Sequence, residues 1–187
     1  MKALIFDRDA GRLSTTWKAG ALLYRGLRRF DTTRGVTSWD DALDWLAGAQ
    51  EPIEEIQYWG HGKWGCALVG DEVLDASSLV SRRRQWAAIR ERLAPDALVW
   101  FRTCETFGAN RGIDFAERLA DFLGARVAGH TYVIHFYQSG LHSLLPGHRA
   151  DWSPTEGLLE GTAETPRRAR SSSPWAPHTV TCLTGHV

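Results

Sequence analysis

Short apolar runs alternate along this chain with longer segments of helical periodicity, and this alternation constrains the fold more than any other feature. The runs that predict strands are residues 2–6, 53–59, 97–101 and 126–136. The segments that predict helices are residues 18–29, 38–48, 82–93 and 113–123. Helices that alternate with apolar strands favour a mostly parallel sheet covered by helices on both faces. The sequence therefore predicts an α/β fold, and the order also leaves room for a strand between the first two helices.

Local signals refine three of these elements. Ser38 with Asp41 three residues later is a capping-box-like helix start, and Gly48 predicts the end of that helix. Gly124 predicts the end of the helix over 113–123. In the first helix, the apolar side chains expected to face the core are Ala21, Leu22, Leu23 and Leu27. Residues 64–74 hold a Gly-Asp pair between short apolar runs, which predicts a hairpin.

The character of the chain changes after Leu145. Five prolines and an Arg-Arg-Ala-Arg-Ser-Ser-Ser run follow, so residues 165–177 are expected to be mobile or held only by their neighbours. Residues 179–183 predict a short returning strand. The predicted organisation is an α/β domain over residues 1–145 and a loop-rich extension over 146–187 that packs on the same domain.

Composition excludes several classes of partner and location. The chain of 187 residues carries 22 Lys plus Arg and 22 Asp plus Glu, so no net field argues for nucleic acid. The sequence contains no apolar stretch long enough for a membrane span, and we expect no membrane partner. Three cysteines give no disulfide framework, and the first residues lack a signal-peptide core. We therefore expect a cytoplasmic protein, with export by a route that needs no signal peptide left open, and the oligomeric state is undetermined.

Two reactive side chains follow the two most apolar strands. His61 comes just after the run 53–59, and Cys104 comes just after the run 97–101. Ligands of an open parallel sheet bind beyond the carboxyl ends of its strands, so neighbouring strands would bring both side chains to one edge. An imidazole beside a thiol stabilises the thiolate and later protonates the leaving group. Either residue alone is more typical of packing or of a turn, but together they predict a catalytic pair.

The residues around this pair suggest supporting roles. Gly62 lets the backbone approach a substrate carbonyl, and its N–H with that of Cys104 would form an oxyanion hole. Asp7 and Asp9 follow the first strand and are candidates to orient His61, the alternative being loop carboxylates in solvent. Arg102 shares the strand face of Cys104 and would line the groove.

No metal or cofactor is predicted. The histidines that invite a metal site are His130, His135, His142 and His148. His130 and His135 lie five residues apart on a predicted strand and would face opposite sides. Zinc ligand spacing with cysteines or an acid pair is missing, so the sequence predicts no metal site. Cys66 and Cys182 are interpreted as packing cysteines, and no phosphate-binding loop is found.

The pair resembles that of the caspase-like cysteine peptidases, which include gingipains, legumains, separases and metacaspases. In that group a His-Gly ends one strand and a Cys ends the next, as His61-Gly62 and Cys104 do here, at a separation close to the roughly 50 residues known in caspases. A bacterial caspase-like domain of unassigned function is closer still. Its pattern resembles residues 53–62, the hairpin to residue 74, the run ending at Cys104 and residues 112–120. The resemblance covers about residues 1–135.

This resemblance implies a three-layer caspase-like sandwich with a central, mostly parallel sheet flanked by helices. It also implies a cysteine endopeptidase, a hydrolase that cleaves peptide or protein substrates through a thioester on Cys104. Caspases place Gln-Ala before the cysteine, whereas Thr103 precedes Cys104 here and Glu105 follows it. A neighbouring carboxylate tends to raise a thiol pKa. The alternative is therefore an inactive caspase-like module that binds or regulates a partner through the same groove, and Glu105 and Arg102 leave the preferred substrate charge open.

Overall fold

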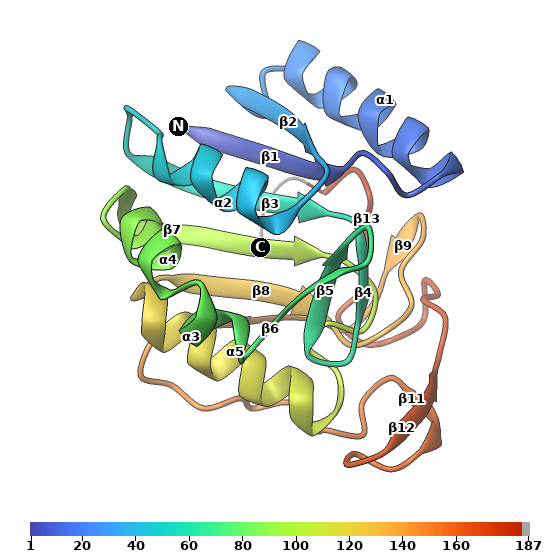
Figure 1. Cartoon of the computed structure of the whole chain (residues 1–187). Coiled ribbons are helices and arrows are strands. Elements are labelled where there is room, and N and C mark those ends of the chain that lie inside the picture. The colour runs from blue at the N-terminus through green and yellow to red at the C-terminus, as the bar shows by residue number, and fades with distance from the viewer. Residues whose placement is uncertain (185–187) are drawn as a thin grey trace.

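A six-stranded sheet forms the centre of the computed structural model, which describes residues 1–184, Arg12 by its backbone alone (Figure 1). In spatial order its strands are β10 (Leu141–Leu144), β8 (Arg126–His130), β7 (Leu93–Arg102), β3 (Ile53–Trp59), β1 (Lys2–Asp7) and β2 (Thr32–Val36). Neighbours pair in parallel except β10, which runs antiparallel to β8 at one edge. The predicted α/β class with a mostly parallel sheet is confirmed, including the strand between the first two helices.

Helices pack against both faces of this sheet. They are α1 (Arg12–Gly26), α2 (Trp39–Ala47), the short α3 (Ser78–Ser81), α4 (Arg83–Arg90) and α5 (Ala109–Leu123). Successive side chains of β1 point to opposite faces. Ala3 and Ile5 join the large core under α2, α4 and α5, whereas Leu4 and Phe6 join a smaller core under α1. The buried strands therefore read as continuous apolar runs.

The predicted helix ends agree with the backbone. The Ser38 hydroxyl accepts a hydrogen bond of 3.0 Å from the N–H of Asp41, and Gly48 is the C-cap of α2. Gly124 ends α5 in the left-handed region, at φ 63°, where a residue without a Cβ carries no steric penalty.

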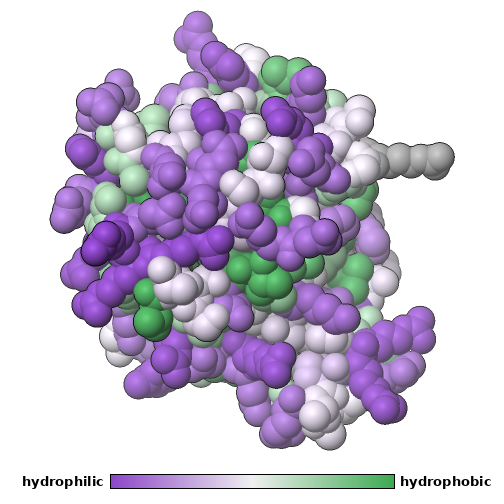
Figure 2. Space-filling view, in the orientation of Figure 1, coloured by the Kyte–Doolittle hydropathy of each residue, from purple (hydrophilic) through white to green (hydrophobic). Residues whose placement is uncertain are grey.

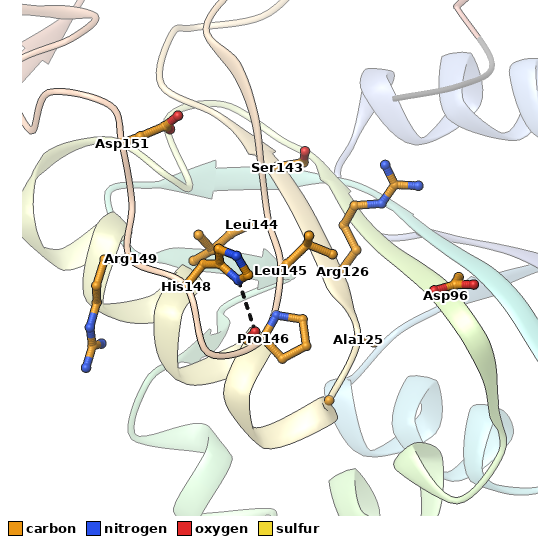
Figure 3. A pocket seen from close by; sticks show the side chains of 11 residues that line it. Asp96, Ala125, Arg126, Ser143, Leu144, Leu145, Pro146, His148, Arg149 and Asp151 are labelled. Atoms are coloured by element: carbon orange, nitrogen blue, oxygen red, sulfur yellow. Dashed lines mark hydrogen bonds between the residues drawn. The ribbon is translucent and has the colours of Figure 1, made fainter.

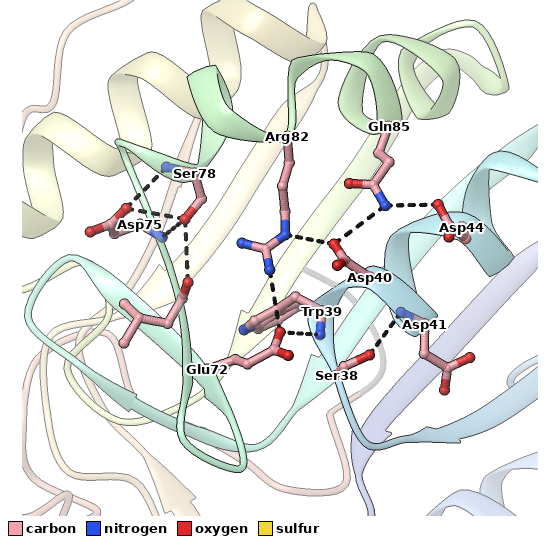
Figure 4. A network of polar contacts seen from close by, with 11 residues as sticks. Ser38, Trp39, Asp40, Asp41, Asp44, Glu72, Asp75, Ser78, Arg82 and Gln85 are labelled. Atoms are coloured by element: carbon pink, nitrogen blue, oxygen red, sulfur yellow. Dashed lines mark hydrogen bonds and ion pairs between the residues drawn. The ribbon is translucent and has the colours of Figure 1, made fainter.

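A polar network joins α2 to the segment that follows the small hairpin (Figure 4). Arg82 donates to Asp40 at 2.9 Å and to Glu72 at 3.3 Å, and Glu72 accepts from the N–H of Trp39 at 2.9 Å. The hydrogen bond from Arg82 lowers the pKa of Asp40. The Arg82 guanidinium thus connects the start of α2 to Glu72.

The buried face of α1 differs from the predicted one. Leu22, Leu23 and Leu27 are exposed, at 57%, 55% and 67%, while Ala21 and Tyr24 pack against the sheet. The helix also begins at Arg12, earlier than the predicted segment. The prediction is confirmed for Ala21 and wrong for the three leucines.

Two further boundaries were predicted wrongly. The basic segment at 82–93 forms only α4, and β7 already begins at Leu93, with Pro95 inside it. The register of β7 against β3 shifts there, and Asp96 has a φ of 61°, as expected where an irregularity admits a proline. The strand predicted over 126–136 ends at His130, where the chain leaves the central sheet.

A small antiparallel sheet stands at the carboxyl ends of the central strands (Figure 1). It consists of β4 (His61–Lys63), β5 (Cys66–Val69) and β6 (Glu72–Asp75). The turn between β5 and β6 is at Gly70, with φ 54°, which confirms the predicted hairpin.

The C-terminal extension is held by hydrogen bonds to the domain. Strand β9 (Tyr137–Gln138) pairs with β13 (Val180–Thr181), which confirms the returning strand, and β11 (Leu158–Gly161) pairs with β12 (Pro166–Ala169). The Trp152 indole donates to the Phe107 carbonyl at 3.0 Å. Residues 165–177 were expected to be mobile or held only by their neighbours, and neighbouring segments hold them: the Val133 N–H donates to the Arg170 carbonyl at 3.0 Å.

Polar side chains cover most of the face in Figure 2, with smaller apolar patches between them.

Candidate active site

The register of the two central strands brings His61 and Cys104 to the same level. Strands β3 and β7 are parallel neighbours, and Trp59 lies opposite Arg102. His61 and Cys104 each follow two residues later. The predicted adjacency of the two strands is confirmed, and both residues leave the sheet together at its carboxyl edge.

His61 and Cys104 line one pocket of about 640 Å³. Its walls come from α1, from the ends of β3 and β7, from residues 134–138 and from Cys182 and Leu183. The large apolar side chains that line it are Leu13, Trp17, Leu23, Trp59, Ile134, Phe136 and Leu183. A concave, mostly apolar pocket with a few polar groups is the usual form of a ligand site. Sequence reasoning missed the contribution of α1 because its leucines were assigned to the core.

Cys104 sits on a tight turn between β7 and α5. The next residue, Glu105, has a φ of 57°, which is uncommon for a residue with a side chain. The hydroxyls of Thr103 and Thr106 hydrogen-bond to each other, and the Thr106 hydroxyl also donates to the Cys66 carbonyl at 3.2 Å. These bonds fix the turn against the small hairpin sheet.

Gly62 packs directly against this turn. A Cβ added at Gly62 would lie 2.8 Å from the Cys104 carbonyl oxygen and 2.7 Å from the Thr103 Cβ. Only glycine lets the two backbones approach this closely. The residue predicted to supply an oxyanion donor is therefore next to the backbone of the predicted nucleophile.

The Cys104 thiol is favoured over the thiolate in this arrangement. Its Sγ lies 3.9 Å from the Ile134 carbonyl oxygen and is only partly exposed. Burial raises the pKa of Cys104, and the charge of Glu105 raises it further. Any activation of this sulfur must therefore come from a base that takes its proton.

His61 is the candidate for that base. Its ring is exposed and packs edge-on against Trp17, with ring centroids 5.4 Å apart. No hydrogen bond to the His61 ring is found within residues 1–184. Asp7 instead accepts from the N–H groups of Asp9 at 2.9 Å and Gly70 at 3.1 Å, and Asp9 is exposed. An orienting role for either carboxylate stays a prediction without a contact to support it.

Arg102 lines the pocket, as predicted for its strand face, but its guanidinium is already engaged. It donates to the Gln138 side-chain oxygen at 2.8 and 3.0 Å and to the Cys182 carbonyl at 2.8 Å. Its guanidinium also lies 4.6 Å from the Trp100 ring centre and 5.4 Å from that of Trp59. Burial lowers its pKa to about 10. Arg102 therefore fastens the C-terminal segment to the end of β7.

Glu105 is not among the residues that line the pocket with Cys104. Its side chain is buried, and its Oε2 has no hydrogen-bond partner among the described residues. Burial raises the pKa of Glu105, while Lys63 opposes that rise. A buried carboxylate with an unsatisfied oxygen is uncommon and is often tied to function.

Two of the four histidines considered for metal, His130 and His148, belong to no cluster of possible metal ligands among the described residues. His130 is fully buried, accepts from the Trp100 indole at 3.3 Å and lies 3.2 Å from the Ser139 carbonyl oxygen. Burial lowers its pKa to about 3. His148 is exposed and contacts only the Pro146 carbonyl through its ring, at 3.2 Å, within the described chain.

A second pocket, of about 610 Å³, lies at the opposite end of the sheet (Figure 3). It is lined by the start of β8 and the end of β10, together with His148 and Asp151. None of its described lining residues is a cysteine, so no thiol nucleophile faces it. Since ligands of parallel sheets bind at the carboxyl ends, the pocket with Cys104 is the candidate active site.

The fold and this pocket define an open α/β sheet protein with a cysteine and a histidine at its carboxyl edge. Residues 32–139, more than half of the chain, match a family described as a domain of unknown function (DUF4347), and the chain belongs to this family. The matched segment contains both His61 and Cys104. No curated protein matches the sequence. Within residues 1–184, no helix has both the length and the apolar character needed to cross a membrane.

Proposed function

We propose that this chain is a caspase-like cysteine peptidase in which Cys104 is the nucleophile and His61 is the general base and acid. One observation carries this proposal: the in-register ends of β3 and β7 deliver both side chains into a single pocket. A thiol and an imidazole at the mouth of one apolar pocket are the parts that thiol hydrolysis needs.

The proposed reaction uses the two reactive side chains that line the pocket. His61 takes the proton of Cys104, the sulfur attacks the peptide carbonyl carbon, and His61 returns the proton to the departing amine. Water then hydrolyses the resulting thioester. The N–H groups of Gly62 and Cys104 are the proposed donors to the oxyanion, and the close approach of Gly62 to the Cys104 turn supports this pairing.

The backbone around the nucleophile supports a catalytic role. Glu105 holds an unfavourable φ immediately after Cys104, and strained residues cluster at functional sites. A nucleophile on a sharp strand-to-helix turn is exposed at the top of its sheet. The arrangement of helices also supports the caspase-like three-layer sandwich, since α1 packs on one face and α2, α4 and α5 on the other.

An inactive binding module is the second candidate function. It is favoured by the raised pKa of Cys104 and by the exposed His61 ring, whose described contact is with Trp17. In that case the same apolar pocket would hold a peptide segment of a partner without cleaving it.

Hydrolysis of a peptide library distinguishes the peptidase from the inactive binding module. We expect cleavage by the wild-type chain under reducing conditions, and loss of at least a hundredfold in rate in Cys104→Ala and His61→Ala. Cys66→Ala is the matched control, because Cys66 is also a partly buried cysteine but contributes only its backbone carbonyl to the turn. Binding of peptides without any cleavage would show that the chain is an inactive binding module.

A further inference from the structure

We propose that His142, Glu156 and His178 form a zinc-binding site at the β10 edge of the sheet, apart from the Cys104 pocket. The three residues come from β10, from the loop before β11 and from the segment before β13. The sequence predicted no metal here because Glu156 and His178 are distant from His142 in the chain. The fold brings them together.

The donor atoms are close enough to bind one ion. One ligand atom from each residue lies within 4.8 Å of the other two, and His142 Nε2 is 2.7 Å from Glu156 Oε1. Ligands about 2.1 Å from a tetrahedral zinc lie about 3.4 Å from each other. Each separation therefore has to change by no more than about 1.5 Å, which side-chain rotation supplies.

Two of the three ligands are already oriented by neighbours. The buried His142 ring stacks on Trp152, with centroids 4.7 Å apart and planes inclined by 18°. The Thr131 hydroxyl donates to Glu156 Oε1 at 2.8 Å. Outer partners of this kind fix the direction of metal ligands and raise affinity.

The third ligand is held next to them by an unusual backbone. His178 has a φ of 49°, and the Leu141 N–H donates to its carbonyl at 3.1 Å. Its ring centroid lies 4.9 Å from that of His142. Left-handed backbone at a residue with a side chain costs energy, and such strain concentrates at ligand sites.

The donor set selects the class of ion. Two imidazoles and one carboxylate suit zinc and other late first-row metals, whereas calcium and magnesium prefer oxygen ligands. Three protein ligands leave a fourth position for water, and the exposed His178 lets solvent reach the site. The alternative is that His142 and Glu156 form only a hydrogen-bonded pair.

Calorimetric titration of the chelator-treated full chain with Zn²⁺ tests the site. The experiment uses the Cys104→Ala background, which removes the thiol of the pocket and makes the result independent of peptidase activity. We expect one zinc ion per chain and a rise in melting temperature on binding. His142→Ala, Glu156→Gln and His178→Ala should each weaken binding at least tenfold, while the exposed His148→Ala should leave it unchanged.

Cobalt substitution supplies a second readout. Bound Co²⁺ should show visible ligand-field bands without the thiolate-to-cobalt charge-transfer absorption that Cys66 or Cys182 would add. Because His178 is exposed, His178→Ala keeps the test decisive if the buried His142→Ala fails to fold. Absence of stoichiometric zinc binding, or binding that His178→Ala and Glu156→Gln leave intact, would overturn the proposal.

Discussion

At the scale of single residues, burial decides the ionisation of the groups near the site. Burial raises the pKa of Cys104 and Glu105, lowers that of His130 to about 3 and lowers that of Arg102 to about 10. Each shift favours the neutral form, as desolvation requires. Sequence spacing located Cys104 and His61, but it could not give these shifts, which depend on how residues 130–138 and 180–184 cover the end of β7.

Glu105→Gln should lower the pKa of Cys104. The substitution removes a negative charge that opposes the thiolate, while the shape of the side chain is kept. The measurement is the rate of Cys104 alkylation by iodoacetamide as a function of pH, with Cys66 and Cys182 replaced by alanine. The exposed Glu91→Gln is the control and should leave the profile unchanged. An identical profile in Glu105→Gln would show that this charge does not reach the sulfur.

The buried His130 should lower the free energy of unfolding as the pH falls. Its folded pKa lies below the unfolded value, so between about pH 6.5 and 3 the unfolded chain binds one more proton than the folded chain. Stability is therefore lost as pH falls through that window, by up to about 1.4 kcal/mol per pH unit. Urea unfolding of wild type and His130→Gln from pH 7 to 4 tests this, and parallel curves would contradict it.

At the scale of elements, the sequence predicted which segments form helices and strands, but not always which face of an element packs against the core. Strands β1 and β3 and the helices α2 and α5 lie where apolar runs and caps predicted them. Helix α1 does not follow its leucines, because Trp59 and Phe30 below it offer an aromatic surface that Tyr24 fills. The end of β8 at His130 was also not predicted, since the apolar character of the chain continues beyond it. Complementary shape across layers is not encoded in local periodicity.

The N-cap of α2 gives a prediction at this scale. Ser38→Ala should lower the free energy of unfolding by about 1 kcal/mol, because the N–H of Asp41 loses its acceptor. Ser81→Ala, at an exposed position of α3, serves as the control and should change stability by less than about 0.5 kcal/mol. Denaturant unfolding followed by circular dichroism measures both, and equal values for the two variants would refute the capping role.

At the scale of the whole molecule, the C-terminal segment completes the candidate site. Cys182 and Leu183 line the pocket, and Arg102 joins the Cys182 carbonyl to the end of β7. The sequence predicted a returning strand over residues 179–183, and β13 forms there, but its pairing with β9 beside the pocket was not predicted. Sequence reasoning could not foresee this, because the contacts depend on a buried arginine whose partners are distant in the chain.

Arg102→Met should release this segment. The change removes the donor to Gln138 and Cys182, and we expect faster hydrogen exchange at residues 180–184 together with a loss of about 2–3 kcal/mol in unfolding free energy. Arg118→Met is the control, because Arg118 is exposed and pairs only with Asp114 within the described residues. If exchange at 180–184 is unchanged in Arg102→Met, the arginine does not fasten the segment.

The most direct test of the catalytic pair is the rate at which a peptidyl chloromethyl ketone modifies Cys104, followed by intact mass and peptide mapping. We expect a single adduct on Cys104 of the wild-type chain, formed at least tenfold more slowly in His61→Ala, with Cys66 and Cys182 unmodified. Modification that is equally fast in His61→Ala, or spread over the three cysteines in proportion to their exposure, would contradict the claim that His61 and Cys104 act together.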